Sequence, residues 1–279
     1  MKKTIIKFAL KEDIGQGDIT TNTLVPKKNN VKARIFSNEQ AVVCGITIVR
    51  QVFKTLDKTV KFNSFYKEGS FVKPGKTIIQ IKGKARAILT GERVALNFLS
   101  HLSGIATQTA RFVNKIKPYK AKILDTRKTL PGLRQLEKYA VKCGGGFNHR
   151  IGLWDMVLIK NNHKIALSPH YKIQELISLA RKRTKNKRIE IEVGNLKEFK
   201  EALKAKPNII MLDNMSLAQI KKAVNFLKLS HKKPDIKLEV SGNINLGNIR
   251  EFAKTGVDFI SVGSITHSVK AIDMSLRII

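Results

Sequence analysis

The sequence predicts an α/β protein whose C-terminal half is a parallel β-sheet closing into a barrel, and three observations support this class. From residue 121 onward, six short strand patterns alternate with helix patterns. The strands are continuous apolar runs, which are typical of a parallel sheet buried on both faces. Almost every strand ends in a polar or glycine cluster, and in such barrels the loops after the strands build the active site.

Length and composition agree with a globular protein. The chain has 279 residues, 42% of them hydrophobic, which is enough for one large or two modest domains. No apolar stretch reaches the ~18 residues of a membrane-spanning helix, and charged residues interrupt the N-terminal apolar run before any signal-peptide cleavage site. The two cysteines, Cys44 and Cys143, have no CxxC partner, which argues against a disulfide framework and a structural zinc site. We expect a cytoplasmic protein without membrane contact.

The formal net charge of +32 raises the alternative of nucleic-acid binding. The excess is spread over both halves of the chain, and its densest run, RKRTKNKR at 181–188, lies between a helix pattern and a strand pattern. Nucleic-acid-binding surfaces interleave basic with aromatic residues, and this run contains no aromatic residue. We therefore expect no specific nucleic-acid partner, only weak nonspecific binding at low salt.

The N-terminal half has a different predicted pattern of secondary structure. Residues 31–90 are predicted to form short strands and turns, including two strands around the Pro74-Gly75 turn. Residues 91–116 are predicted to form a long amphipathic helix that connects the two halves. Small residues at 103–106 within it indicate either close packing or a break.

The six strands of the C-terminal half can be assigned directly. Each is followed by a helix pattern, and a final helix is expected at the C-terminus. The strand segments are AKILDT (121–126), MVLIKNN (156–162), RIEIEV (188–193), NIIMLDN (208–214), IKLEVSG (236–242) and FISVGS (259–264).

The residues at the strand ends are the candidate functional residues. Helix capping explains one or two polar strand ends but not charged residues at nearly all of them, so we expect a shared active site. These positions are Asp125, Arg127, Lys128, Lys160, Asn161, His163, Glu192, Asp213, Asn214, Glu239, Ser241, Gly242, Gly263 and Ser264.

The charges at these positions indicate a polyanionic ligand. Arg127, Lys128 and Lys160, joined by His149-Arg150 of the loop CGGGFNHR, supply several cations, and guanidinium groups suit carboxylates or phosphates. Glu192 and Asp213 could hold a magnesium ion or sugar hydroxyls, with charge balance of the lysines as the alternative. The backbone at Gly242 and Gly263 could bind a phosphate, although both could also be ordinary turn glycines.

Several longer motifs extend over nearly the whole chain: EDIGQGDITT (12–21), GERVALNFLSHLSGIAT (91–107), LDTRKTLPGLRQLEKYAVKCGGGFNHR (124–150), LIKNNH (158–163), MLDNM (211–215), EVSGNI (239–244) and GVDFISVGSITHS (256–268). Together they resemble the quinolinate phosphoribosyltransferase family nearly from end to end. Two departures stand out: Asn161 lies where the family usually has Asp, and Asn243 where it usually has a second Gly.

This resemblance implies an N-terminal α/β sandwich (1–107), against which a C-terminal helix (268–279) would pack, and an incomplete TIM-like α/β barrel (108–267). It implies a pentosyltransferase of NAD biosynthesis that converts quinolinate and 5-phosphoribosyl 1-diphosphate to nicotinate mononucleotide, CO2 and diphosphate. It also implies Mg2+ as cofactor and a homodimer. The alternative is a paralogue of the same fold, of the molybdenum-transport-associated type, that uses another acceptor.

The resemblance also implies residue roles. Arg93 is expected to reach the site from the partner subunit. Lys128, Glu192 and Asp213 match the catalytic positions, with Lys128 at the diphosphate and the two carboxylates at ribose and magnesium. The dicarboxylate-binding positions match Arg93, Arg127, His149, Arg150 and Lys160, and the phosphate-binding positions match Ser241, Gly242, Gly263 and His267.

Overall fold

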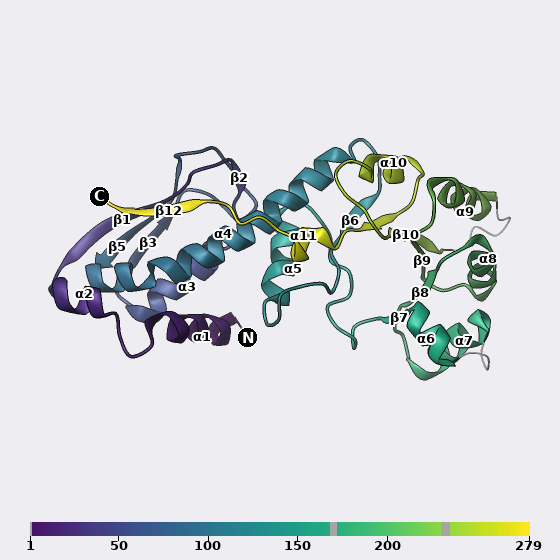
Figure 1. Ribbon diagram of the computed structural model, residues 1–279, viewed down its shortest axis with the longest axis horizontal. Helices are drawn as coiled ribbons and strands as arrows, with labels where there is room; N and C mark the ends of the chain where they lie inside the picture. The colour runs from purple at the N-terminus through teal and green to yellow at the C-terminus, as the bar shows by residue number, and fades with distance from the viewer. Residues whose placement is uncertain (1, 168–171, 230–234) are drawn as a thin grey trace. The chain divides into compact units, whose positions relative to one another are not determined.

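The computed structural model describes residues 2–167, 172–229 and 235–279, which form two compact units (Figure 1). The first unit comprises Met1–Ala110, Thr129–Gly145 and Ile265–Ile279, and the second comprises Arg111–Lys128 and Gly146–Ser264. Among the described residues, no helix is both long and apolar enough to cross a membrane.

The first unit is an antiparallel sheet with helices. Four strands lie in the order β12 (Met274–Ile278), β1 (Asn30–Ser37), β5 (Thr77–Lys84) and β3 (Lys61–Ser64), and Ala33 pairs with Ile81 and Ile278. Buried residues of this sheet and of α3 form its core. Its helices are α1 (Lys2–Ile14), α2 (Ile19–Leu24), α3 (Ile46–Leu56), α4 (Ala85–Lys115) and α5 (Arg134–Cys143).

The C-terminal segment differs from the sequence prediction. A helix was expected over 268–279, but Met274–Ile278 forms β12 and pairs antiparallel with β1. The free edge of β1 satisfies the backbone hydrogen bonds of this segment, which a pattern search within the segment cannot detect. The segment does pack on the first unit, as a strand rather than a helix.

Two further N-terminal predictions are corrected. Residues 46–56 form α3 instead of a strand or turn, and its first N–H groups are capped by Glu68, whose carboxylate accepts from Gly45 N at 2.7 Å and Thr47 N at 3.1 Å. The strands on either side of the Pro74-Gly75 turn do not pair with each other. Instead, β4 (Phe71–Val72) pairs with β2 (Ala41–Val42), and β5 pairs with β1 and β3.

The predicted long helix over residues 91–116 is confirmed. It is α4, which begins six residues earlier, at Ala85. It has no break at its small residues. A Cβ at Gly104 would clash with the carbonyl oxygen of Lys270, and Ser103 is fully buried. Close packing therefore explains these small residues.

Gly104→Ala is expected to destabilise the protein by about 1–3 kcal/mol, because the added methyl group meets backbone that cannot move freely. Alanine normally stabilises a helix relative to glycine, so packing must override helix propensity here. Urea unfolding measures the effect. Asn97→Ala, an exposed position on the same helix, is the control and should be neutral or slightly stabilising. Greater stability of Gly104→Ala would contradict the packing argument.

The second unit is a six-stranded parallel sheet with helices. Its order is β6 (Lys122–Leu124), β11 (Phe259–Ser261), β10 (Lys237–Ser241), β9 (Ile209–Asp213), β8 (Ile189–Val193) and β7 (Val157–Ile159). All six predicted strands are confirmed. Its helices are α6 (Asn161–Leu167), α7 (Ile173–Arg183), α8 (Leu196–Ala205), α9 (Leu217–Leu229) and α10 (Ile249–Lys254), and the four-residue α11 (Ser264–His267) follows β11.

The sheet of the second unit is open. In the part of the chain that the structure describes, β6 and β7 each pair with one strand and not with each other, so the barrel is incomplete. Side chains at 0% exposure, including Ile191, Ile210, Leu212 and Ile260, lie on one face of the sheet, opposite to the face that carries Glu190 and Glu239. The predicted fold class, an α/β sandwich and an open TIM-like α/β barrel, is confirmed.

Candidate active site

Parallel pairing brings the predicted strand-end residues of the second unit to one edge of the sheet. Ser241 on β10 pairs with Asp213 on β9, and Glu192 on β8 pairs with Met211. Lys160 follows β7 directly, and Arg127 and Lys128 follow β6. Carboxyl ends of parallel strands in α/β folds form the ligand-binding edge.

Lys160 lies beside Glu192 at this edge. Its Nζ is 3.9 Å from Glu192 Oε2, and the backbone N–H of Asn161 donates to Glu192 Oε1 at 3.4 Å. Because the lysine is half-exposed and the contact is long, the pair contributes little stability, and Lys160 keeps charge available for an anionic ligand. Asn161 makes this contact through its backbone N–H. An asparagine at this position can therefore donate the same hydrogen bond as an aspartate.

Asp213 lies in a network of turn residues. Its Oδ2 accepts a hydrogen bond from Asn214 Nδ2 at 2.9 Å, and Asn243 Nδ2 donates to Asn214 Oδ1 at 3.3 Å. Gly242 has φ +105°, and a Cβ there would clash with the Asn214 side chain. Asn243 has φ +51°, a left-handed conformation that asparagine tolerates better than most residues. The backbone at 243 is therefore compatible with this departure from glycine.

Arg150 and Arg127 place two guanidinium groups near each other. Arg150 is 6% exposed and its Nη1 donates to the carbonyl oxygen of Met156 at 3.2 Å. Burial, and then the positive charge of Arg127, lowers the pKa of Arg150. Two like charges in this position favour an anion between or beside them.

His149 has a polar neighbour at each ring nitrogen. Its Nδ1 accepts from the backbone N–H of Arg150 at 2.7 Å, which places the proton of the neutral ring on Nε2, 2.9 Å from Glu190 Oε2. The His149 backbone N–H also donates to Asp125 Oδ1 at 2.9 Å. The side chain is therefore oriented toward buried carboxylates, and its contact with a substrate carboxylate stays a prediction.

Two known family models match the sequence of this chain. The family model described as "Quinolinate phosphoribosyl transferase, N-terminal domain" matches residues 18–103, and the model of the C-terminal domain matches residues 105–277. The chain belongs to the quinolinate phosphoribosyltransferase family.

Relatives of this family match over almost the full chain. A probable nicotinate-nucleotide pyrophosphorylase [carboxylating] of Methanocaldococcus jannaschii is 43% identical over 99% of this chain and 96% of its own. The corresponding Bacillus subtilis protein is 39% identical over 100% and 93%. The solved nicotinate-nucleotide pyrophosphorylase of Francisella tularensis has a TM-score of 0.92 and 44% identity, covering 100% of this chain and 96% of that one.

Two carboxylates of this family member, Glu190 and Glu239, are buried in the second unit; Glu239 is one of the predicted strand-end residues, whereas Glu190 was not predicted. Both have 0% exposure. Burial raises the pKa of Glu190 to about 7, and burial together with the Glu190 charge raises the pKa of Glu239 to about 8. Their carboxylate oxygens lie within 4.8 Å of each other, and the Ser261 hydroxyl donates to Glu239 Oε1. At neutral pH this pair therefore retains a proton.

The alternating pattern of the strand sequence indicates an inward-facing position for Glu190 as well as for Glu192. Alternation along the strand IEIEV places Glu190 and Glu192 on the same face, with Glu190 one step deeper. In a barrel, side chains from alternate strands share an interior layer, as Glu190 of β8 and Glu239 of β10 do. The spacing thus predicts an interior polar layer beneath the strand-end residues.

Glu239→Gln is expected to make stability less dependent on pH. A carboxyl whose folded pKa is raised contributes full stability below its unfolded pKa, and that contribution is lost as pH rises toward the folded value of about 8. The stability of the variant relative to wild type should therefore rise between pH 5 and 8, by about 1 kcal/mol or more. Urea unfolding across this range measures it. Glu251→Gln, at an exposed site on α10, should show no such rise.

Arg93 and His267, two other predicted site residues of this family member, lie in the first unit. Arg93 is exposed on α4, and His267 is exposed at the end of α11, where its Nδ1 lies 2.6 Å from Ser268 Oγ. Their contacts with a ligand stay predictions. The remaining predicted phosphate-side residues, Ser241, Gly242 and Gly263, lie at the ends of β10 and β11.

Proposed function

We propose that this chain is a decarboxylating quinolinate phosphoribosyltransferase. It would transfer the phosphoribosyl group of 5-phosphoribosyl 1-diphosphate to the quinolinate nitrogen and release diphosphate, CO2 and nicotinate mononucleotide. One observation carries the proposal: Arg127, Lys128 and Lys160 lie on the same sheet edge as Glu192 and Asp213. Cations for a dicarboxylate and two phosphate groups, beside carboxylates for a sugar, match both substrates. Near-full-length relatives named for this reaction support it.

The proposed role of the cations is orientation and charge neutralisation. Arg127, Arg150 and Lys160 hold the two quinolinate carboxylates so that the ring nitrogen faces the anomeric carbon. Lys128, whose backbone N–H donates to Thr126 Oγ1 at 3.1 Å in a tight turn, is exposed at the strand end and neutralises the departing diphosphate. His149 positions Arg150 through the hydrogen bond to the Arg150 backbone.

Glu192 and Asp213 are the proposed ribose and Mg2+ residues. They are carboxylates on neighbouring strands, and oxygen ligands of this kind, completed by substrate phosphates and water, suit Mg2+. The ion, when bound, supplies Lewis-acid stabilisation of the diphosphate leaving group. The chain's part is to hold the two carboxylates at the ribose side, where Asn214 donates to Asp213.

Loss of the 2-carboxylate needs no base. Once the nitrogen is bonded to ribose, its positive charge stabilises the electron pair that departing CO2 leaves on C2, and a proton from water then bonds to C2 to give nicotinate mononucleotide. The Arg127 and Arg150 guanidinium groups keep the carboxylate in place until then. No covalent link to the protein forms.

We also propose a homodimer in which Arg93 of one subunit completes the partner's dicarboxylate site. Arg93 is exposed on α4, and the family resemblance assigns its position to dicarboxylate binding. An arginine donated across an isologous interface would occur twice in the dimer.

A turnover assay tests the reaction. Purified protein is incubated with quinolinate, the phosphoribosyl donor and Mg2+, and nicotinate mononucleotide and CO2 are measured. Stoichiometric formation of both is expected. The same assay with nicotinate or other pyridine acceptors distinguishes a paralogue, because product from those and none from quinolinate would reject the proposed acceptor.

Asp213→Ala is expected to raise the KM for the phosphoribosyl donor about tenfold or more, because it removes a charged ligand of the sugar and metal side. Quinolinate affinity should stay nearly unchanged. Steady-state kinetics at varied donor and Mg2+ measures the effect. Asp235→Ala, which removes an exposed carboxylate before β10, is the matched control. A normal donor KM and normal Mg2+ dependence in Asp213→Ala would contradict the assignment.

A further inference from the structure

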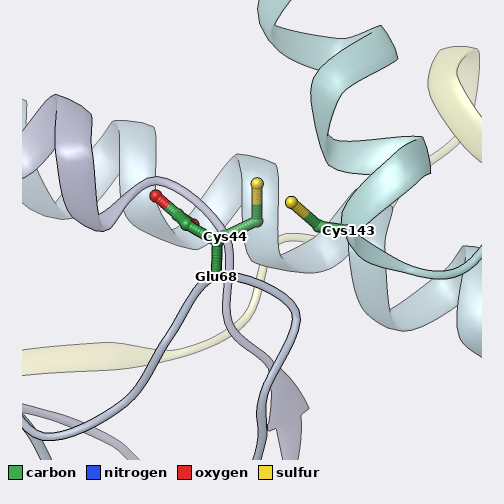
Figure 2. A group of neighbouring side chains, drawn as sticks. All are labelled: Cys44, Glu68 and Cys143. Atoms are coloured by element: carbon green, nitrogen blue, oxygen red, sulfur yellow. The ribbon is translucent and has the colours of Figure 1, made fainter.

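The first unit brings its two cysteines together. The sulfur atoms of Cys44 and Cys143 and a carboxylate oxygen of Glu68 all lie within 4.8 Å of one another. In Figure 2 the Cys143 sulfur points toward the Cys44 sulfur, and the Glu68 carboxylate is drawn on the other side of Cys44. Both cysteines are free thiols in this structure. The wide spacing of the two residues in the sequence gave no indication of this contact.

The backbone on both sides of the pair is fixed. The Cys44 N–H donates to Ser103 Oγ at 3.0 Å, and the Ser103 hydroxyl lies 3.2 Å from the Cys44 carbonyl oxygen. Cys143 is the last residue of α5, and Gly69 packs so closely that a Cβ there would lie 3.0 Å from the Cys143 carbonyl oxygen. The two sulfur atoms are therefore held facing one another by packing.

Glu68 is already engaged as a helix cap. Its Oε2 accepts from Gly45 N, and its Oε1 accepts from Thr47 N. These bonds direct the carboxylate to the N-terminus of α3, where a positive ion would be opposed by the helix dipole. A two-sulfur, one-carboxylate metal site is consequently less favoured than direct chemistry between the two thiols.

The two thiols differ in character. A hydrogen bond from Cys44 lowers the pKa of Cys143, while that same contact and burial raise the pKa of Cys44. Cys44 has 0% exposure, whereas Cys143 is partly exposed. Because the thiolate is the nucleophile in disulfide exchange, Cys143 is the attacking residue and Cys44 the resolving one.

We propose that Cys44 and Cys143 form a reversible intrachain disulfide when the protein meets a low-molecular-weight disulfide. The Cys143 thiolate attacks one sulfur of the reagent RSSR, which breaks its S–S bond, forms Cys143–S–S–R and releases RS⁻. The Cys44 sulfur then attacks the Cys143 sulfur, releases the second RS⁻ and gives up its proton to it. In total, two protein thiols are oxidised to one disulfide and RSSR is reduced to two RSH.

Oxidised glutathione is the probe for the test. Native, fully reduced, full-length protein should lose two hydrogen atoms by intact mass and become resistant to alkylation after denaturation. Dithiothreitol should reverse both changes. No disulfide-linked dimer should appear on a non-reducing gel. A wild-type protein that keeps a bound glutathione, or that crosslinks between chains, would overturn the proposal.

Two single variants separate the roles. Cys44→Ser should retain one glutathione on Cys143, because no resolving thiol remains. Cys143→Ser should stay unmodified, because Cys44 is buried. Circular dichroism establishes that both variants are folded, and the wild-type mass result stands independently of them. Equal modification of both variants would contradict the assigned order.

Zinc binding is the competing outcome. Reduced wild-type protein is titrated with Zn2+ alone, and Cys44→Ser and Cys143→Ser are titrated in parallel. Equal weak binding in all three is expected. Stoichiometric binding that both variants abolish would replace the disulfide assignment with a metal site.

Discussion

Arg127→Ala and Lys160→Ala are each expected to weaken quinolinate binding about tenfold to a hundredfold. Each change removes a charge-assisted contact, worth roughly 1.5–3 kcal/mol, from the proposed dicarboxylate site. Lys160 follows β7 directly and has only a long contact to Glu192, so the stability of the fold should depend little on its charge. Isothermal titration calorimetry of the folded variants measures the affinity.

The control for these variants is Lys204→Ala. Lys204 is exposed in the last turn of α8, at the end of the helix away from the strand carboxyl ends. Lys204→Ala removes one positive charge, as Arg127→Ala and Lys160→Ala do. An unspecific effect of net charge would therefore weaken quinolinate binding in the control as well. Unchanged quinolinate affinity in both Arg127→Ala and Lys160→Ala would mean that the dicarboxylate binds elsewhere.

Mixing two inactive variants is expected to restore about a quarter of wild-type activity. Arg93→Ala and Lys160→Ala homodimers should each be nearly inactive. In a mixed dimer, one site combines the intact Arg93 of one chain with the intact Lys160 of the other, while the second site carries both defects. Random exchange makes half of the dimers mixed, and each has one intact site of two. Activity before and after subunit exchange measures the recovery.

Native mass spectrometry must accompany this experiment. It establishes that the variants are dimers and that the chains have exchanged. With exchange established, no recovery would place Arg93 in its own subunit's site or outside the site. A protein that stays monomeric during turnover would reject the shared site directly.

Local sequence patterns predicted most of the second unit. All six strands were expected, because each is an apolar run bounded by polar or glycine residues. The grouping of Lys160, Glu192 and Asp213 at one edge followed from a general property of parallel sheets, whose carboxyl ends coincide. Alternation within IEIEV also places the buried Glu190 on the same face as Glu192, one step deeper in the sheet.

Elements that depend on distant partners were not predictable in the same way. Residues 46–56 are rich in β-branched side chains, yet they form α3, whose N-terminus is capped by Glu68. Residues 274–278 form a strand because β1 offers a free edge. In both cases the deciding hydrogen bonds come from another part of the chain, and no window along the sequence contains them.

The sequence by itself determined the order of strands and helices in the barrel, the residue types at its ligand-binding edge and the family. The tertiary structure alone decided how His149 is oriented against Glu190, and that Cys44 meets Cys143. Periodicity and strand-end chemistry are local properties that neighbouring residues encode. Buried pairs form only when folding brings distant segments together, and burial then changes the protonation of their side chains.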